Sequence, residues 1–146
     1  MIDRKARNAL AERLRHLASG SMSNNRFESL SCRSKDRVIA ELEWHLALPV
    51  YDDMHEHRLS GEFALTYGQR RDFARAILFL KTEFEYEWKT KRGLRGFLNS
   101  TFRLKPLRRI PPVDTTGGDL RVWPFYHQED YAKALKTKPY LYGGRN

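Results

Sequence analysis

Eight basic side chains between residues 89 and 109 form the pattern in this chain that is best suited to binding a ligand. No carboxylate occurs in this basic stretch, so its positive charge has no local counterpart. An arginine guanidinium presents a planar fork of N–H donors, stays charged and is less strongly hydrated than an ammonium, which suits it to phosphate groups. The residues that we expect to bind are Lys89, Lys91, Arg92, Arg95, Arg103, Lys105, Arg108 and Arg109.

The spacing within the basic stretch predicts a helix with one cationic face. Arg92, Arg95, Asn99 and Arg103 follow one another at intervals of three, four and four residues. These intervals place them on one side of a helix, opposite a largely apolar side. The alternative interpretation is a solvated surface helix whose apolar side simply completes the core.

The charge of the whole chain separates along the sequence. Residues 1–88 hold 14 Lys and Arg against 14 Asp and Glu, whereas residues 89–146 hold 13 against 4, so the net charge of +9 lies in the C-terminal part. A field of one sign attracts polyanions. We therefore expect a non-enzymatic interaction protein that binds a polyanionic surface, with nucleic acid as the first choice of partner. The alternative is an accessory, inhibitor or immunity-like protein that binds an acidic protein partner through the same stretch.

A second group of side chains has the types that ligate metals. It consists of Asp52, Asp53, His55, Glu56 and His57. Only Asp53 and His57 have the spacing that brings two side chains together on a helix, whereas a metal site needs three or four ligands around one point. We therefore expect a polar helix end with an ion pair, and no metal.

Two further features could support catalysis. Glu87-Trp88-Lys89 matches the E-x-K triplet of metal-dependent nucleases and falls on a predicted strand, but so short a motif arises readily by chance. Cys32 lies beside Arg33, which could lower its pKa, yet no histidine neighbours it as a base. Nuclease activity is the least favoured alternative, and no cofactor is expected.

Helical patterns in the first half must position these residues. Asp3 can cap a helix over residues 4–18 that ends at Gly20. A short helical turn is expected near Phe27. Residues 35–54 carry an apolar stripe interrupted by Pro49, which predicts a kinked helix or two abutting ones. The T-x-x-Q spacing of Thr66 and Gln69 predicts a capping box before a central helix over 69–82.

The second half predicts a small sheet and one more helix. Phe84, Tyr86 and Trp88 alternate with glutamates, which is typical of a strand, and residues 120–125 are the expected partner strand. Residues 129–135 have the charge pattern of a short helix that ends before Pro139. The predicted fold is mainly α: a single domain over 1–146, with a compact helical core (1–88), a two-stranded β element and a basic C-terminal subregion (89–146).

The overall composition limits the class of protein. An apolar content of 40% supports a folded core, and no run of residues is long and apolar enough to cross a membrane. The first twenty residues lack the apolar run of a secretory signal. A single cysteine excludes an internal disulfide and suits a reducing compartment, so we expect a cytoplasmic protein.

Several segments resemble small bacterial proteins to which no activity is assigned. The similarity runs from residue 51 to residue 88, through Tyr51-Asp52-Asp53, Glu56-His57-Arg58-Leu59, Ala76-Ile77-Leu78-Phe79-Leu80 and Glu85-Tyr86-Glu87-Trp88. It returns at Gly118-Asp119, Val122-Trp123-Pro124-Phe125 and Tyr131. The resemblance implies a bacterial, cytoplasmic setting and supplies no site residues.

Overall fold

The computed structural model describes residues 1–31, 33–52, 54–89 and 117–137, and these residues are mainly helical. The first helix is α1 (Arg4–Ala18), whose N-cap Asp3 accepts a hydrogen bond from the backbone N–H of Ala6 at 3.0 Å. After the helix, Gly20 adopts a positive φ of 72° that side chains rarely tolerate. The helix begins and ends at the residues predicted from the sequence, 4 and 18.

The next elements are α2 (Asn24–Ser29) and a longer helical rod that changes its winding twice. The rod begins as α3 (Arg37–Leu42), continues as the π-helical η1 (Glu43–Ala47) and ends as the 3₁₀-helical η2 (Leu48–Val50). The backbone N–H of Leu48 bonds to the carbonyl of Glu43, which is the wide π spacing. The predicted interruption at Pro49 is confirmed, although the rod ends at Val50 rather than continuing to residue 54.

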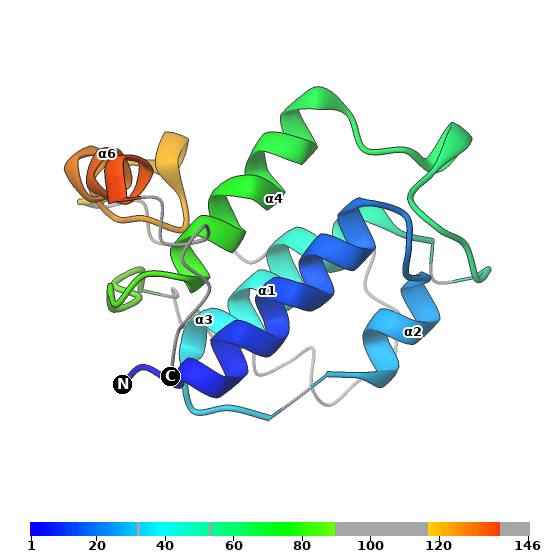
Figure 1. Cartoon of the computed structure of the whole chain (residues 1–146), viewed down its shortest axis with the longest axis horizontal. Helices are drawn as coiled ribbons and strands as arrows, with labels where there is room; N and C mark the ends of the chain where they lie inside the picture. The colour runs from blue at the N-terminus through cyan, green and yellow to red at the C-terminus, as the bar shows by residue number, and fades with distance from the viewer. Residues whose placement is uncertain (32, 53, 90–116, 138–146) are drawn as a thin grey trace, which may run out of the picture.

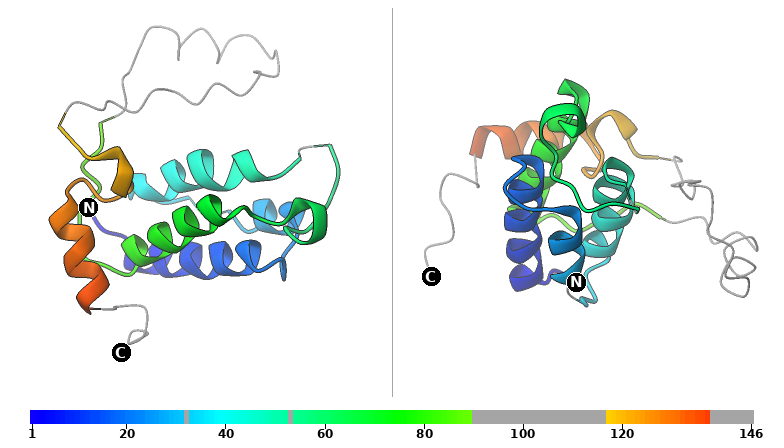
Figure 2. Two further views of the ribbon diagram at one scale, coloured as in Figure 1. Left: turned by 90° about the horizontal axis from the view of Figure 1, so that it is seen from above. Right: turned by 90° about the vertical axis from the view of Figure 1, so that its right-hand side faces the viewer.

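The central helix is α4 (Tyr67–Leu80), which follows the short 3₁₀ turn η3 (Gly61–Phe63). Its capping box is present: Thr66 accepts from the N–H of Gln69, and the Gln69 side chain accepts from the N–H of Thr66. Figure 1 shows that α4 runs antiparallel to α1. Figure 2 shows α1, α4 and the α3 rod side by side.

The C-terminal part of the described chain contributes η4 (Leu120–Val122) and α6 (Gln128–Thr137). Helix α6 packs against α4. It lies across one end of the layer that α1, α4 and the α3 rod form side by side (Figure 2). Its position confirms the predicted helix before Pro139. None of the helices in the described ranges is long and apolar enough to cross a bilayer.

The predicted pair of strands is not formed by the residues assigned to it. Residues 83–89 are irregular, residues 120–122 form a 3₁₀ turn, and the described residues contain no named strand. The alternation nevertheless holds, because Tyr86 and Trp88 are buried whereas Glu85 and Glu87 are exposed. Arginine side chains replace a neighbouring strand as hydrogen-bond donors to the carbonyls of Thr82, Phe84 and Trp88.

A buried ion pair joins α1 to the start of α3, and the same arginine reaches the segment after α4. The Arg7 side chain is fully buried, and its Nε lies 2.6 Å from Oδ2 of Asp36. Arg7 also donates to the carbonyls of Thr82 and Phe84, at 3.3 Å and 2.8 Å. One guanidinium therefore connects α1, the start of α3 and the chain segment that leads from α4 to Trp88.

Candidate nucleic-acid interface

The structure describes only the first residue of the predicted binding set. Lys89 is exposed and directly follows the buried Trp88. The other seven residues lie outside the described residues: Lys91, Arg92, Arg95, Arg103, Lys105, Arg108 and Arg109. The predicted cationic helix face over 92–103 also lies outside them and stays a prediction.

Residues on either side of the basic stretch meet in the described core. The indole N–H of Trp88 donates to the carbonyls of Pro124 and Phe125, each at 3.1 Å, and its ring stands edge-on to Tyr126 with 5.2 Å between centroids. Gly118 lies against the same two aromatic rings. We call Trp88, Gly118 and residues 124–126 the aromatic clasp. It brings together the points at which the described chain stops at Lys89 and resumes at Gly117.

Gly118 is expected to be essential for close packing in the aromatic clasp. A Cβ at this position would lie 2.7 Å from Cη2 of Trp88 and 2.9 Å from Cδ2 of Tyr126, and rigid rings cannot yield easily. Gly118→Ala should therefore lower the free energy of unfolding by about 1–3 kcal/mol. Gly68→Ala is the control, since a Cβ there meets nothing within 4 Å and alanine favours a helix. Chemical denaturation of both variants tests this, and equal stabilities would contradict it.

The side chain of Arg37 connects the aromatic clasp to the α3 rod. Arg37 donates to the carbonyl of Trp88 at 2.9 Å, and its guanidinium lies over the ring of Tyr86 at 5.8 Å. The Tyr86 hydroxyl accepts a bond from the indole N–H of Trp123, and burial raises its pKa far above the ordinary value. The Arg37 side chain remains half exposed where the basic stretch begins, and its guanidinium lies 3.9 Å from the carboxylate of Glu41.

His45 occupies the other side of Trp123. Its Nε2 lies 3.0 Å from Oε2 of Glu41, its ring is edge-on to Trp123, and its side chain is only 8% exposed. The Nδ1 atom is buried without a hydrogen-bond partner among the described residues. The contact with Glu41, four residues earlier, joins successive turns of the α3 rod.

Most of the net positive charge lies outside the described core. The described ranges contain 18 Lys and Arg against 16 Asp and Glu, and the remaining residues contain 9 against 2. Within the core, many arginines are committed to internal ion pairs, as in Arg4 with Glu83, Arg13 with Glu43 and Arg75 with Asp72. The core is therefore close to electrically balanced, and the excess charge belongs chiefly to the basic stretch.

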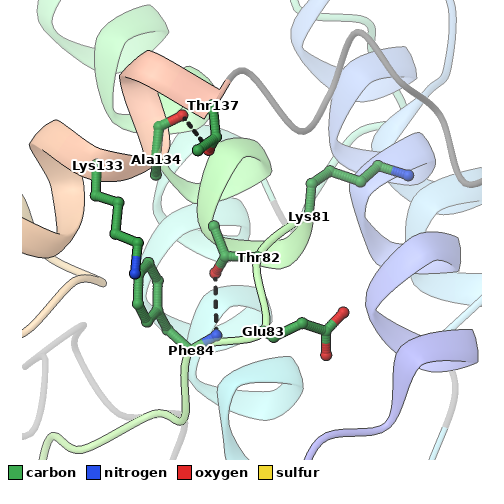
Figure 3. Close-up of a pocket in the computed structure, with 7 residues that line it drawn as sticks. All are labelled: Lys81, Thr82, Glu83, Phe84, Lys133, Ala134 and Thr137. Atoms are coloured by element: carbon green, nitrogen blue, oxygen red, sulfur yellow. Dashed lines mark hydrogen bonds between the residues drawn. The ribbon is translucent and has the colours of Figure 1, made fainter.

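A cavity of about 300 Å³ lies between the end of α4 and α6 (Figure 3). Figure 3 shows Lys133 extending along the ring of Phe84 and Lys81 extending away toward α1. Lys81 donates to Oδ1 of Asn8 at 3.1 Å, and burial lowers the pKa of its ammonium. Glu83 at the rim is paired with Arg4. The charged groups here are thus already used in joining elements of the fold.

The group of possible metal ligands forms a loop rather than the predicted helix end. Asp52 bonds to the N–H of Met54 and to Nδ1 of His55, and the former contact contributes most to lowering its pKa. The Asn24 side chain holds the same loop through the carbonyls of Asp52 and His55. Within the described residues no three such ligands gather, and Asp53 lies outside them.

The two weaker catalytic candidates gain no supporting geometry. Glu87 is exposed and Trp88 buried, but the segment is not the strand that the nuclease pattern requires. Cys32 lies outside the described residues, so its candidacy as a nucleophile is not tested.

Comparisons with protein-family models, curated proteins and solved structures find no match. The resemblance of residues 51–88 to small bacterial proteins therefore stays a prediction. What the chain does must be argued from its own side chains.

Sequence reasoning missed the residues that hold the clasp in place. Arg37, Gly118 and Pro124 were not among the expected site residues, because their contacts join segments far apart in the chain. A usable signal did exist for Trp88: it ends the alternating run directly before the basic stretch, where a large buried side chain can fix the position of that stretch.

Proposed function

We propose that this protein binds nucleic acid through the cations of the basic stretch, in a reducing, cytoplasmic setting. The observation that supports the proposal is the charge distribution. The described core is nearly balanced and internally paired, whereas residues 90–116 carry seven Lys and Arg and one Asp. Such an excess in one segment of a folded protein favours phosphate binding over an internal structural role.

The aromatic clasp supports the same proposal physically. It fixes Trp88 and Gly118 in contact, so the cations between them begin and end at one place on the core. Arg37 and Lys89 are exposed at that place. Lys89 therefore adds a described cation at the point where the segment that carries most of the net charge joins the core.

Removing three of these arginines should weaken binding and flatten its dependence on salt. Each phosphate contact with duplex DNA contributes about 0.9 to the slope of log affinity against log salt, so Arg92→Gln, Arg95→Gln and Arg103→Gln together should lower the slope by about 2–3. The measurement is fluorescence anisotropy with a labelled duplex and a labelled single strand over a range of salt concentrations.

The matched control removes the same charge from the described core. Lys5, Arg26 and Lys136 are exposed there, and replacing all three with glutamine should change the slope far less. If the unaltered protein fails to bind either nucleic acid at micromolar concentration and low salt, the proposal is wrong. Equal effects of the two triple variants would instead mean that net charge, and not the basic stretch, governs binding.

A further inference from the structure

A second cavity opens between α1, α2 and the α3 rod, on residues that the basic stretch does not include. Its volume is about 320 Å³. A volume near 300 Å³ lies at the lower end of the range for small-ligand sites. Aromatic side chains line the cavity together with charged ones: Phe27, Trp44 and Tyr51 with Arg13, Glu28 and Glu43. This lining suits a small ligand that has both a flat face and a charge.

The charge of the lining is negative, in contrast to that of the whole chain. Two carboxylates, those of Glu28 and Glu43, line the cavity with a single guanidinium, that of Arg13. The chain as a whole carries a net charge of +9. An excess of negative charge attracts a cation and disfavours an anion such as phosphate. The cavity therefore prefers a ligand of the opposite charge from the one that the basic stretch prefers.

Arg13 shows how the lining of this cavity holds a cation. Its guanidinium lies over the ring of Phe27 at 4.3 Å, and Nη1 donates to the carboxylate of Glu43 at 2.7 Å. The cation thus has an aromatic face on one side and a carboxylate as its acceptor, and both of these contacts stabilise a guanidinium. The hydroxyl of Ser31 donates to the second oxygen of Glu43, so this carboxylate already has partners.

Trp44 and Glu28 give the same cavity a second aromatic face and a second carboxylate. The Trp44 side chain is 55% exposed, and within the described ranges its indole has no ring contact, cation or hydrogen bond. The Glu28 side chain is exposed on α2, and among the same residues its carboxylate has neither an ion pair nor a hydrogen bond. These two side chains therefore lack the cation that Arg13 supplies to Phe27 and Glu43.

The π-helical turn η1 contributes two of the lining residues. Glu43 and Trp44 are its first two residues, and both line the cavity. Turns of this width are rare within α-helices and occur frequently at functional sites. The unusual winding of the rod therefore coincides with the cavity, which is an observation independent of its charge.

We propose that this cavity binds the guanidinium group of a small organic cation. The flat face of the guanidinium stacks on Trp44, and its N–H groups donate to the carboxylate of Glu28. A guanidinium fits better than an ammonium, because it is flat, is less strongly hydrated and donates two parallel hydrogen bonds to one carboxylate. The inference goes beyond the proposed nucleic-acid function and does not depend on it, since none of these residues belongs to the basic stretch.

The test uses three small probes, the N-acetyl amides of arginine, citrulline and lysine. Citrulline has nearly the shape of arginine without its charge, and lysine keeps the charge without the flat fork of donors. Titrations are followed by the backbone amide NMR shifts of the cavity residues at about 0.15 M salt, which screens the general repulsion between a cation and this basic chain. The arginine probe should bind with a Kd in the millimolar range, and the other two at least about threefold more weakly.

Two substitutions locate the binding at the proposed side chains. Trp44→Ala and Glu28→Gln should each weaken binding of the arginine probe by about two- to fivefold. Both residues are exposed, so both variants should fold. The matched controls are Tyr67→Ala, which removes an aromatic ring that is 78% exposed, and Glu62→Gln, which removes an exposed carboxylate. Neither control residue lines the cavity, and neither substitution should change the binding.

The possible results are distinct from those that test the nucleic-acid function. Equal binding of the arginine and citrulline probes would show that the cavity does not recognise charge, and it would overturn the inference. Equal binding of the arginine and lysine probes would overturn the assignment of a guanidinium. The site is also wrong if no cavity amide shifts with millimolar arginine probe, or if the control variants weaken binding as much as Trp44→Ala does.

Discussion

Asp36→Ala is expected to lower the free energy of unfolding by about 3–5 kcal/mol, the largest loss from any single charged residue described above. The substitution leaves the guanidinium of Arg7 fully buried without its carboxylate partner, and it also removes the acceptor for the backbone N–H of Asp3. A buried charge that has lost its partner is far more costly than the net stabilisation that the intact pair provides. Urea denaturation followed by circular dichroism measures the loss.

Glu83→Ala provides the matched control for this prediction. The contact of Glu83 with Arg4 has the same length as that of Asp36 with Arg7, 2.6 Å, but the Glu83 side chain is 78% exposed. Since water screens an exposed pair, its loss should lower stability by less than about 1 kcal/mol. Similar losses in the two variants would show that burial does not determine the contribution of these ion pairs.

Trp88→Ala is expected to destabilise the protein by about 3–5 kcal/mol as well, for a different reason. The indole is 1% exposed, packs on Gly118 and Tyr126, and donates to two backbone carbonyls. Truncation leaves a cavity and deprives the carbonyls of Pro124 and Phe125 of their donor.

Trp44→Ala serves as the comparison, because it removes the same side chain from a position that is 55% exposed. Its effect on the free energy of unfolding should stay within about 0.5 kcal/mol, as for most surface substitutions. Thermal unfolding of the two variants side by side gives the answer. A stable Trp88→Ala protein would mean that the aromatic clasp does not hold the two sides of the basic stretch together.

Local signals predicted the helices well because their causes are local. The Asp3 cap, the Thr66 and Gln69 capping box and the interruption at Pro49 each depend on residues within a few positions of one another. The prediction of a strand over residues 84–88 was wrong for a physical reason. Alternating burial requires an extended segment with two different faces, but it does not require a neighbouring strand when side-chain donors reach the backbone from elsewhere.

The buried charges show what a residue-by-residue interpretation misses. Arg7 lies at helical spacing from Leu10, Leu14 and Leu17, so its position on the apolar face of α1 was visible in the sequence. A charged residue at such a position indicates a buried partner. Which carboxylate pairs with it depends on how α1 and α3 pack, and no local pattern identifies Asp36.

The candidate interface was predictable only in part. The charge separation is evident from the sequence, because it needs no knowledge of contacts. The clasp depends on a glycine that permits two aromatic rings to approach. It is a consequence of tertiary packing between segments that are distant in the sequence.

The arginines of α1 also determine the order in which this protein can assemble during translation. The carbonyls that accept from Arg4 and Arg7 belong to Leu80, Thr82 and Phe84, between 75 and 78 residues later in the chain. At about 5–20 residues per second, the ribosome makes those acceptors roughly 4–15 seconds after the arginines. Throughout that interval the newly made α1 lacks α4, the helix against which it packs most extensively, so the nascent chain passes through a stage that is vulnerable to association with other proteins.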